Sequence, residues 1–137
     1  MASTTQAIRA IERVSSFGFG PEPTERQMQT VLQEVERQHA ESDSAELQFL
    51  LGIGWRNYTA WFISGDKRKP FLETAASHFE RAYALERNKS GSKWRMYACE
   101  YGALIADEAL IRDLDRAIAV FEAVFNSTGR YEPRFCS

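Results

Sequence analysis

The residues of this sequence that are typical of metal chemistry are few and far apart. The chain has two histidines, His39 and His78. Glu36 and His39 have the i, i+3 spacing of a di-iron carboxylate site, but such a site needs a second Glu-x-x-His pair and two further helical glutamates. The sequence has no second pair, and His78 lies beside Phe79 in a helical pattern typical of a packed or rim residue. We therefore predict that the chain holds no metal ion.

Acid–base catalysis has one candidate pair, Glu100 and Asp107. The two residues are seven positions apart, which places both on one face of a helix. Paired carboxylates can divide the roles of acid and base, but no other residue marks a substrate pocket between them. A nucleophile elbow, a phosphate-binding loop, a zinc-protease motif and a dinucleotide-binding fingerprint are all absent. We predict a protein that is not an enzyme and uses no cofactor.

Cys99 and Cys136 are the two cysteines of the chain. Two cysteines form neither a disulfide framework nor a zinc site. Cys99 lies within a helical pattern, which predicts a buried thiol, whereas Cys136 is close to the C-terminus. Residues 1–16 lack the apolar core of a secretory signal. Together these features favour a location in the reducing cytoplasm.

Length and composition fit a single domain covering residues 1–137. Hydrophobic residues make up 44% of the chain and charged residues 26%, as in ordinary globular proteins. A net charge of −2 does not suit a strongly basic nucleic-acid-binding protein. The most apolar segment, residues 47–63, contains one charged residue, Arg56. Because a membrane-spanning helix needs about 20 mostly apolar residues, we predict a soluble protein with a buried helix there and no membrane insertion.

Apolar residues recur at helical spacing along the chain, and this pattern predicts an all-α fold. Thr24 and Gln27 have the spacing of a capping box at the start of one helix. The predicted helices cover approximately residues 4–15, 24–40, 44–64, 70–87, 93–111 and 113–126, and the segments between them are rich in Gly, Pro, Ser and Asn. Six helices with short connections favour three antiparallel hairpins.

The fourth and sixth predicted helices share a sequence pattern. Residues 74–83 align with residues 116–125, and both segments contain Ala-x-x-x-Phe-Glu. The matched positions are Ala75 with Ala117 and Phe79 with Phe121. An internal repeat of this kind indicates that one structural unit occurs more than once.

The third and fifth predicted helices match more weakly, through Gly52 and Gly102. Residues 51–55, Leu-Gly-Ile-Gly-Trp, followed by the Ala-x-x-x-Phe pattern, resemble the tetratricopeptide repeat (TPR) family, whose pattern is W-x₂-L-G-x₂-Y, then A-x₃-F, then P. The resemblance covers about residues 44–127, although the closing proline is missing from both units. It implies that helical hairpins stack as a short right-handed superhelix.

The resemblance also implies a domain layout. Residues 44–90 and 91–127 would form two TPR-like units. Residues 1–43, which show no motif, would form an N-terminal cap or a divergent hairpin, and residues 128–137 would form a tail. A hairpin leaves an apolar face that its neighbour must cover, so the three hairpins would fold as one body.

In TPR proteins the first helices of successive units line a concave groove that receives a partner peptide or helix. Carried over by position, this groove would be lined by Glu46, Phe49, Ile53, Arg56 and Asn57 of one unit and by Met96, Cys99, Ala103, Ala106 and Asp107 of the next. Arg56 would hold a carboxylate of the partner, and Asn57 would hold its backbone amides. Asp107 would repel acidic partners, or pair with Arg56 in the unbound protein. The resemblance therefore implies an adapter, scaffold or assembly factor that binds another protein.

Three alternatives stay open at the sequence level. The N-terminal helices or the tail, with Tyr131 and Phe135, could fill the groove, so that its residues are simply core. The chain could be a helical bundle that binds a small apolar ligand in a cavity lined by Phe49, Trp55 and Met96. It could also be a self-associating structural subunit, for example a homodimer.

Two surface features complete the prediction. Trp61 and Phe62 lie in the extra length before the turn at Gly65, and they would form a second partner-binding patch if they project beyond the hairpin. Basic residues gather in residues 67–69 and in residues 87–95. These two segments fall at successive turns, hence at opposite ends of the hairpins, so we expect solvated turns rather than one nucleic-acid-binding surface.

Overall fold

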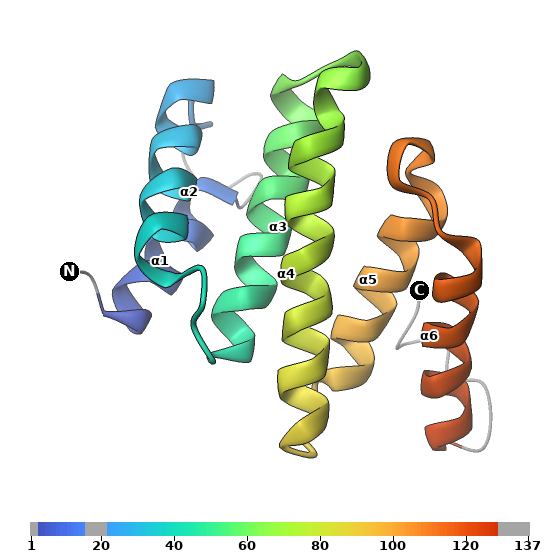
Figure 1. Cartoon of the computed structure of the whole chain (residues 1–137). Helices are drawn as coiled ribbons and strands as arrows, with labels where there is room; N and C mark the ends of the chain where they lie inside the picture. The colour runs from blue at the N-terminus through green and yellow to red at the C-terminus, as the bar shows by residue number, and fades with distance from the viewer. Residues whose placement is uncertain (1–2, 16–21, 129–137) are drawn as a thin grey trace.

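The computed structural model describes residues 3–15 and 22–128, and those residues form an all-α fold without strands (Figure 1). The α-helices are α1 (Thr4–Ser15), α2 (Glu25–His39), α3 (Ala45–Phe62), α4 (Lys69–Asn88), α5 (Trp94–Asp107) and α6 (Leu114–Thr128). Two short 3₁₀ helices, η1 (Gly65–Arg68) and η2 (Ala109–Ile111), lie in the connections before α4 and before α6. The predicted fold class is therefore confirmed.

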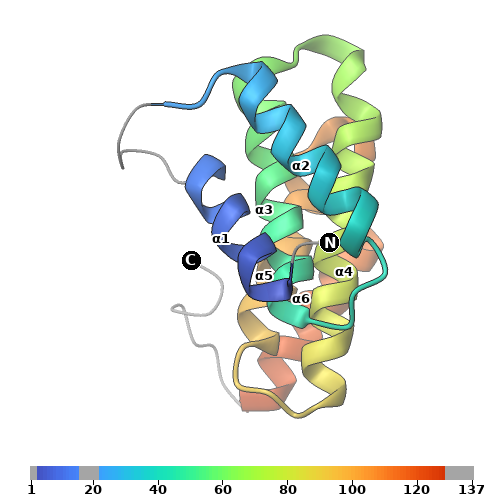
Figure 2. The ribbon, with the colours of Figure 1, turned by 90° about the vertical axis from the view of Figure 1, so that its left-hand side faces the viewer.

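Consecutive helices pack against each other as three hairpins, α1–α2, α3–α4 and α5–α6. Figure 1 shows α2, α4 and α6 in front and α1, α3 and α5 behind them, and Figure 2 shows the α1–α2 hairpin from the side. The α1–α2 hairpin covers one side of α3, and α4 packs between α3 and α5. The α1–α2 hairpin is the first of the three along the chain.

Local signals in the sequence explain where the helices begin. Thr24 Oγ1 accepts a hydrogen bond from the Gln27 amide at 3.1 Å, and Gln27 Oε1 accepts one from the Thr24 amide at 2.9 Å, which is the predicted capping box. Ser44 Oγ accepts from the Leu47 amide at 3.2 Å and caps α3. Pro70 lies in the first turn of α4, where a missing N–H costs nothing.

The fifth helix is shorter than predicted, because α5 ends at Asp107 rather than near Ile111. The Arg112 guanidinium donates from Nε to the Ala106 carbonyl at 2.9 Å, and the Asp113 amide donates to the Ile105 carbonyl at 2.8 Å. These bonds satisfy carbonyls of the last turn that would otherwise lack partners. The chain then forms η2. The sequence keeps its helical periodicity through these residues, although the helix itself ends at Asp107.

The repeated Gly and Phe positions make the same contact in two hairpins. A Cβ atom added to Gly52 would lie 2.6 Å from a ring carbon of Phe79, and one added to Gly102 would lie 2.8 Å from Phe121. Both distances are too short for a real Cβ, so each glycine lets the facing ring reach the helix backbone. The pattern that repeats in the sequence therefore corresponds to a contact that repeats in the structure.

α3 is buried on most of its surface, as predicted for residues 47–63. A Cβ atom added to Gly54 would lie 2.5 Å from Leu32 Cδ2. Gly54 therefore lets α2 approach α3 closely, as Gly52 lets α4 approach it. Leu32, Leu47 and Leu51 are fully buried. Within the described ranges, no helix has the length and apolar character needed to cross a membrane.

Candidate binding groove between helices α4 and α6

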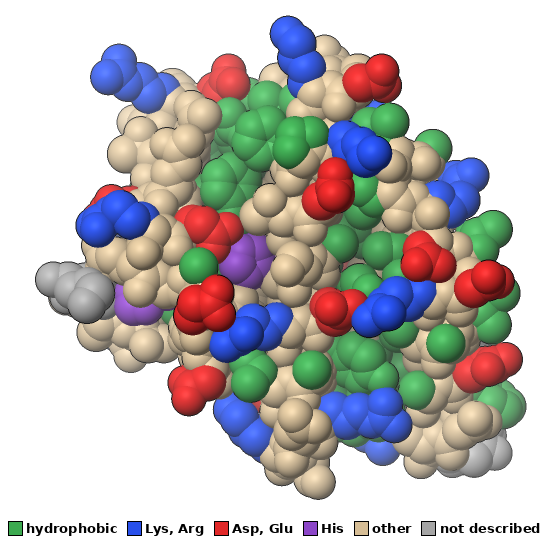
Figure 3. All heavy atoms as spheres, in the orientation of Figure 1, with side chains coloured by type: hydrophobic (Ala, Val, Ile, Leu, Met, Phe, Trp, Pro, Cys, Tyr) green, Lys and Arg blue, Asp and Glu red, His purple; other side chains and the backbone are tan. Residues whose placement is uncertain are grey.

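A groove of about 370 Å³ lies between α4 and α6, with α5 beneath it. We call it the α4–α6 groove. It is lined by Lys69, Glu73, Ala76, Ser77, Glu80, Tyr101, Ile105, Leu110, Ile111, Asp113 and Arg116. Figure 3 shows hydrophobic side chains between these two helices with charged side chains on both rims. A volume of this size is typical of sites that bind small molecules or short peptide segments.

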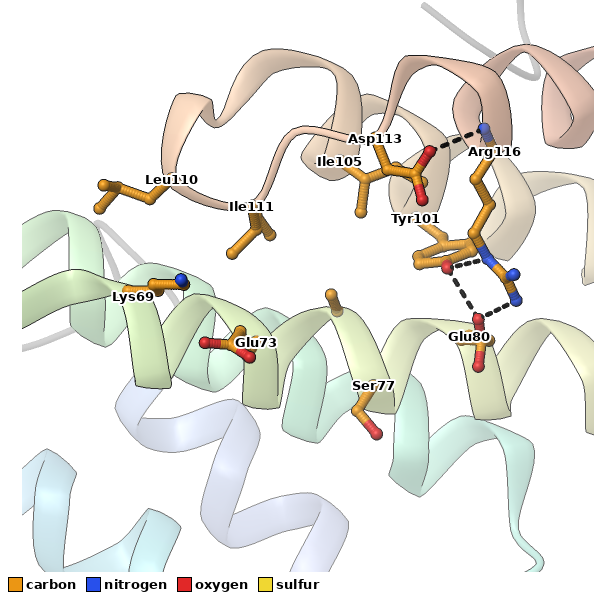
Figure 4. A pocket seen from close by; sticks show the side chains of 11 residues that line it. Lys69, Glu73, Ser77, Glu80, Tyr101, Ile105, Leu110, Ile111, Asp113 and Arg116 are labelled. Atoms are coloured by element: carbon orange, nitrogen blue, oxygen red, sulfur yellow. Dashed lines mark hydrogen bonds and ion pairs between the residues drawn. The ribbon is translucent and has the colours of Figure 1, made fainter. Parts of the chain in front are cut away.

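The middle of the groove is apolar. Ile105 of α5 is buried and forms its floor, while Leu110 and Ile111 of η2 are half-buried and form one wall. In Figure 4, Ile105 and Ile111 point from the α5–α6 side toward α4. Ala76 on α4 is small, so it leaves room opposite these side chains. The break between α5 and α6 therefore shapes the groove, because η2 supplies its wall.

One end of the groove is closed by three polar side chains from three helices (Figure 4). The Tyr101 hydroxyl donates to Glu80 Oε2 at 2.7 Å and accepts from Arg116 Nε at 2.6 Å. Arg116 also forms an ion pair with Glu80, and its guanidinium carbon lies 5.8 Å from the centre of the Tyr101 ring. Asp113 Oδ1 accepts from the Arg116 amide at 3.1 Å, which fixes the start of α6. These bonds hold α4, α5 and α6 together beside the groove.

The cluster contains one negative and one positive side chain, those of Glu80 and Arg116, so its charges balance. Burial, followed by the Glu80 carboxylate, raises the pKa of Tyr101 to about 12, although Arg116 acts in the opposite direction. The Tyr101 hydroxyl, followed by Glu80, raises the pKa of Arg116. Tyr101 is therefore a neutral donor at ordinary pH, and it is suited to positioning Glu80 and Arg116 rather than to moving protons.

Two charged side chains, those of Lys69 and Glu73, line the opposite end of the groove. Neither side chain takes part in an ion pair with the part of the chain that the structure describes. Lys69 and Glu80 are eleven positions apart, about 16 Å along the axis of α4. An extended segment of about five residues would span this length. The groove thus offers an apolar centre with charges at both ends.

The predicted groove on the first helices is arranged differently from the prediction. Arg56 Nη1 forms an ion pair with Glu100 Oε2 at 2.6 Å, so its partner is Glu100 and not Asp107. Asn57 Nδ2 donates to the Ser15 carbonyl at 3.2 Å, so its amide joins α3 to α1. Asp107 lies seven residues, about two helical turns, beyond Glu100 and is exposed at the end of α5.

The apolar residues of that predicted groove are divided between core and surface. Phe49 stacks on Tyr97 with ring centres 4.4 Å apart, and Cys99 is buried. Cys99 is not a free cysteine in the structure, so the predicted buried thiol is wrong. Ile53 and Ala103 are half-buried, and Met96 is 41% exposed. Two of these five residues, Phe49 and Cys99, therefore serve packing, and the other three keep part of their surface exposed.

The other predicted sites have the following places. Trp61 and Phe62 are half-buried and pack against the core, so they do not project beyond the hairpin. The centres of the Phe62 and Tyr58 rings are 5.7 Å apart. Trp55 is buried and stacks on Phe71, with ring centres 5.8 Å apart, whereas Phe49 stacks on Tyr97. The cavity residues Phe49, Trp55 and Met96 thus lie in three different environments. Tyr131, Phe135 and Cys136 lie outside the described residues.

Sequence reasoning missed the α4–α6 groove. One signal was available: Lys69, Glu73, Ala76 and Glu80 follow i, i+4 or i, i+3 spacing and therefore share one face of α4. That face is small and charged, which is typical of solvent exposure. The groove also depends on η2, and the helical spacing of residues 105–111 concealed this break.

A buried polar network joins α2, α3 and α4 on the other side of α4. His78 Nδ1 lies 2.6 Å from Gln48 Oε1, and His78 Nε2 lies 2.8 Å from Glu36 Oε1. Gln48 Nε2 donates to the carbonyls of Ala40 and Ser42, at 3.0 and 2.7 Å. His78 is therefore a packed residue that holds three helices together, as the sequence indicated.

The structure also bears on the metal and acid–base candidates. Within residues 3–15 and 22–128, no group of three or more His, Cys, Asp or Glu side chains could hold a metal ion. Glu100, one of the two carboxylates considered for acid–base work, is paired with Arg56 instead. No protein family, curated protein or solved structure matches this chain. The function must therefore be argued from the groove itself.

Proposed function

We propose that this protein is a non-enzymatic adapter with TPR-like stacked hairpins, and that it binds a short segment of a partner protein in the α4–α6 groove. The observation that carries the proposal is the groove, whose apolar centre lies between charged ends. Such a site favours a segment with one or two apolar side chains flanked by charged residues. The Glu80–Tyr101–Arg116 cluster gives the groove a rigid end, and rigidity lowers the cost of ordering a partner.

The face formed by α3 and α5 is the second place where a partner could bind. Ile53, Arg56, Ala103 and Met96 keep part of their surface exposed there. A carboxylate of a partner would have to compete with Glu100 for Arg56, and Asn57 is already engaged with Ser15. For this reason we place the main site between α4 and α6.

A variant in which a large side chain fills the α4–α6 groove tests the proposal. A random peptide library displayed on phage would be selected on the wild-type protein and then measured against two variants. In Ala76→Trp the indole fills the centre of the groove, whereas Ala84→Trp places the same side chain on an exposed part of α4 outside it. We expect Ala76→Trp to weaken selected peptides at least about tenfold, roughly 1.4 kcal/mol, and Ala84→Trp to bind them normally. Equal binding by both variants, with both folded by circular dichroism, would reject the groove.

Self-association is the second candidate function, because α6 carries an exposed apolar stripe. Leu114, Ile118 and Phe125 are 54%, 53% and 49% exposed, and their spacing places them on one side of the helix. A second copy of the chain could cover such a stripe. This candidate and the adapter are compatible, since the stripe and the α4–α6 groove use different residues.

The oligomeric state distinguishes this candidate. Light scattering after size exclusion would give the mass over a range of protein concentrations. If the stripe mediates association, Ile118→Glu should produce a monomer, while Ala119→Glu, an exposed neighbour off the stripe, should not. A wild-type protein that stays monomeric at the highest concentration would remove self-association as a function.

A further inference from the structure

Four basic residues gather around the turn between α4 and α5, which lies at the bottom of Figure 1. Arg87, Lys89, Lys93 and Arg95 occur within nine positions, and we call them the basic patch. Arg87, Lys89 and Lys93 are exposed, and Arg95 is half-buried. This patch is separate from the α4–α6 groove, because none of its residues lines the groove.

Aromatic rings hold the two guanidinium groups of the patch in place. The guanidinium carbons of Arg87 and Arg95 each lie 4.9 Å from the centre of a Trp94 ring, and Trp94 stacks on Tyr83 at 5.9 Å. Arg87 Nη1 also donates to the Tyr83 hydroxyl at 2.7 Å, and Arg95 Nε donates to Ser127 Oγ at 2.8 Å. The Arg87 guanidinium, fixed on a ring in this way, loses little entropy when it binds an oxyanion with its remaining N–H groups.

Three of the four cations of the patch lack an ion-pair partner within the described ranges. Arg87, Lys89 and Lys93 take part in none of the ion pairs among the described residues. Glu86 is the acidic residue beside the patch in sequence, but its side chain turns under the loop at Gly91 and accepts from the Lys93 amide at 3.4 Å. The patch therefore presents several cations to solvent.

We propose that the basic patch binds a short acidic segment of a partner protein. Two or three carboxylates within a few residues would match the size of the patch and the forked geometry of its guanidinium groups. A nucleic acid fits less well, because its phosphates would continue past the patch. Without these four residues the chain carries thirteen Lys and Arg against nineteen Asp and Glu, so the remaining surface would repel a long polyanion.

The test compares two charge reversals that change the net charge equally. Lys89→Glu with Lys93→Glu alters the patch, while Arg26→Glu with Lys67→Glu alters the beginning of α2 and η1 at the top of Figure 1. All four positions are exposed, and none belongs to an ion pair among the described residues. The probe is fluorescein-labelled hexaglutamate, measured by fluorescence anisotropy at low and at moderate salt. A hexanucleotide of thymidine provides the comparison.

We expect wild type to bind hexaglutamate, with an affinity that falls as salt is added. The patch variant should bind at least about tenfold more weakly, and the control variant within about twofold of wild type. Equal weakening by both variants, or no binding by wild type, would overturn the assignment. Tighter binding of the oligonucleotide than of hexaglutamate, lost in the patch variant, would overturn the choice of an acidic protein segment and favour a nucleic acid. None of these outcomes depends on the α4–α6 groove, which the variants leave intact.

Discussion

At the scale of single residues, the hydrogen-bond network around His78 determines where its protons are. Gln48 uses both amide hydrogens on the carbonyls of Ala40 and Ser42, so its Oε1 must accept from His78 Nδ1. His78 Nε2 lies 2.8 Å from Glu36 Oε1. His78 Nδ1 therefore carries a proton, and the ring joins Gln48 of α3 to Glu36 of α2. Glu36 Oε2 is buried without a hydrogen-bond partner among the described residues.

Nitrogen NMR of the histidine rings would check this tautomer. We expect Nδ1 of His78 to carry a proton in the wild-type protein. In Glu36→Gln the new amide can donate to Nε2, so the proton should stay on Nδ1. His39 provides an internal comparison in the same spectra. A His78 ring without a proton on Nδ1 would contradict the network as described.

Two buried tyrosines should make the protein sensitive to alkali. Burial, followed by the charges of Glu86 and Glu46, raises the pKa of Tyr97 to about 12, and the pKa of Tyr101 is raised to about 12 as well. Because the folded state holds these protons more tightly than the unfolded chain, the stabilisation is complete below about pH 10 and is lost as the pH rises through about 12.

The ultraviolet absorbance of tyrosinate measures this effect. In the folded protein one class of tyrosines, the late class, should ionise only near pH 12, where the protein unfolds. In the urea-unfolded chain all tyrosines should ionise near pH 10. Tyr97→Phe and Tyr101→Phe should each reduce the late class. Ionisation of all tyrosines near pH 10 in the folded protein would contradict the burial of these two side chains.

At the scale of the helices, two glycines set the distance between neighbours. Alanine is the better helix former by about 1 kcal/mol, yet Gly52→Ala and Gly102→Ala should each destabilise the protein by about 1–3 kcal/mol. The reason is that the new methyl group would overlap the ring of Phe79 or Phe121. Urea denaturation measures the change. Gly52→Ala should cost less when combined with Phe79→Leu, and a stabilising Gly52→Ala would show that the helices separate freely.

At the scale of the whole molecule, the three hairpins should unfold together. Leu32 of α2 is fully buried against α3, and α3 in turn packs on α4. Leu32→Ala should therefore lower the stability of the entire chain by about 2–5 kcal/mol. Circular dichroism, which reports on all helices, and tryptophan fluorescence, which reports on α3 and α5, should give one shared transition. Separate transitions would show that the α1–α2 hairpin folds independently of the rest.

The sequence predicts much of this fold and little of the binding groove. Helical spacing, the Thr24 capping box and the repeated Gly and Phe positions are local signals, and the structure has the helices, the cap and the contacts they indicate. The α4–α6 groove is assembled from three helices and from η2, whose residues keep helical spacing although α5 ends before them. The predicted pairing of Arg56 with Asp107 is wrong for a similar reason. Spacing shows that Glu100 and Asp107 share a helix face, but not which of the two lies closer to Arg56.

α4 connects most of the features described above, since its sides carry the groove residues Glu73 and Glu80, the network residue His78, and Arg87 of the basic patch. Each residue advances an α-helix by about 100°. One residue inserted near the middle of α4 would therefore turn everything beyond it away from its partners at once. An alignment of relatives should accordingly place no gaps within Lys69–Asn88, even where the amino acids themselves differ.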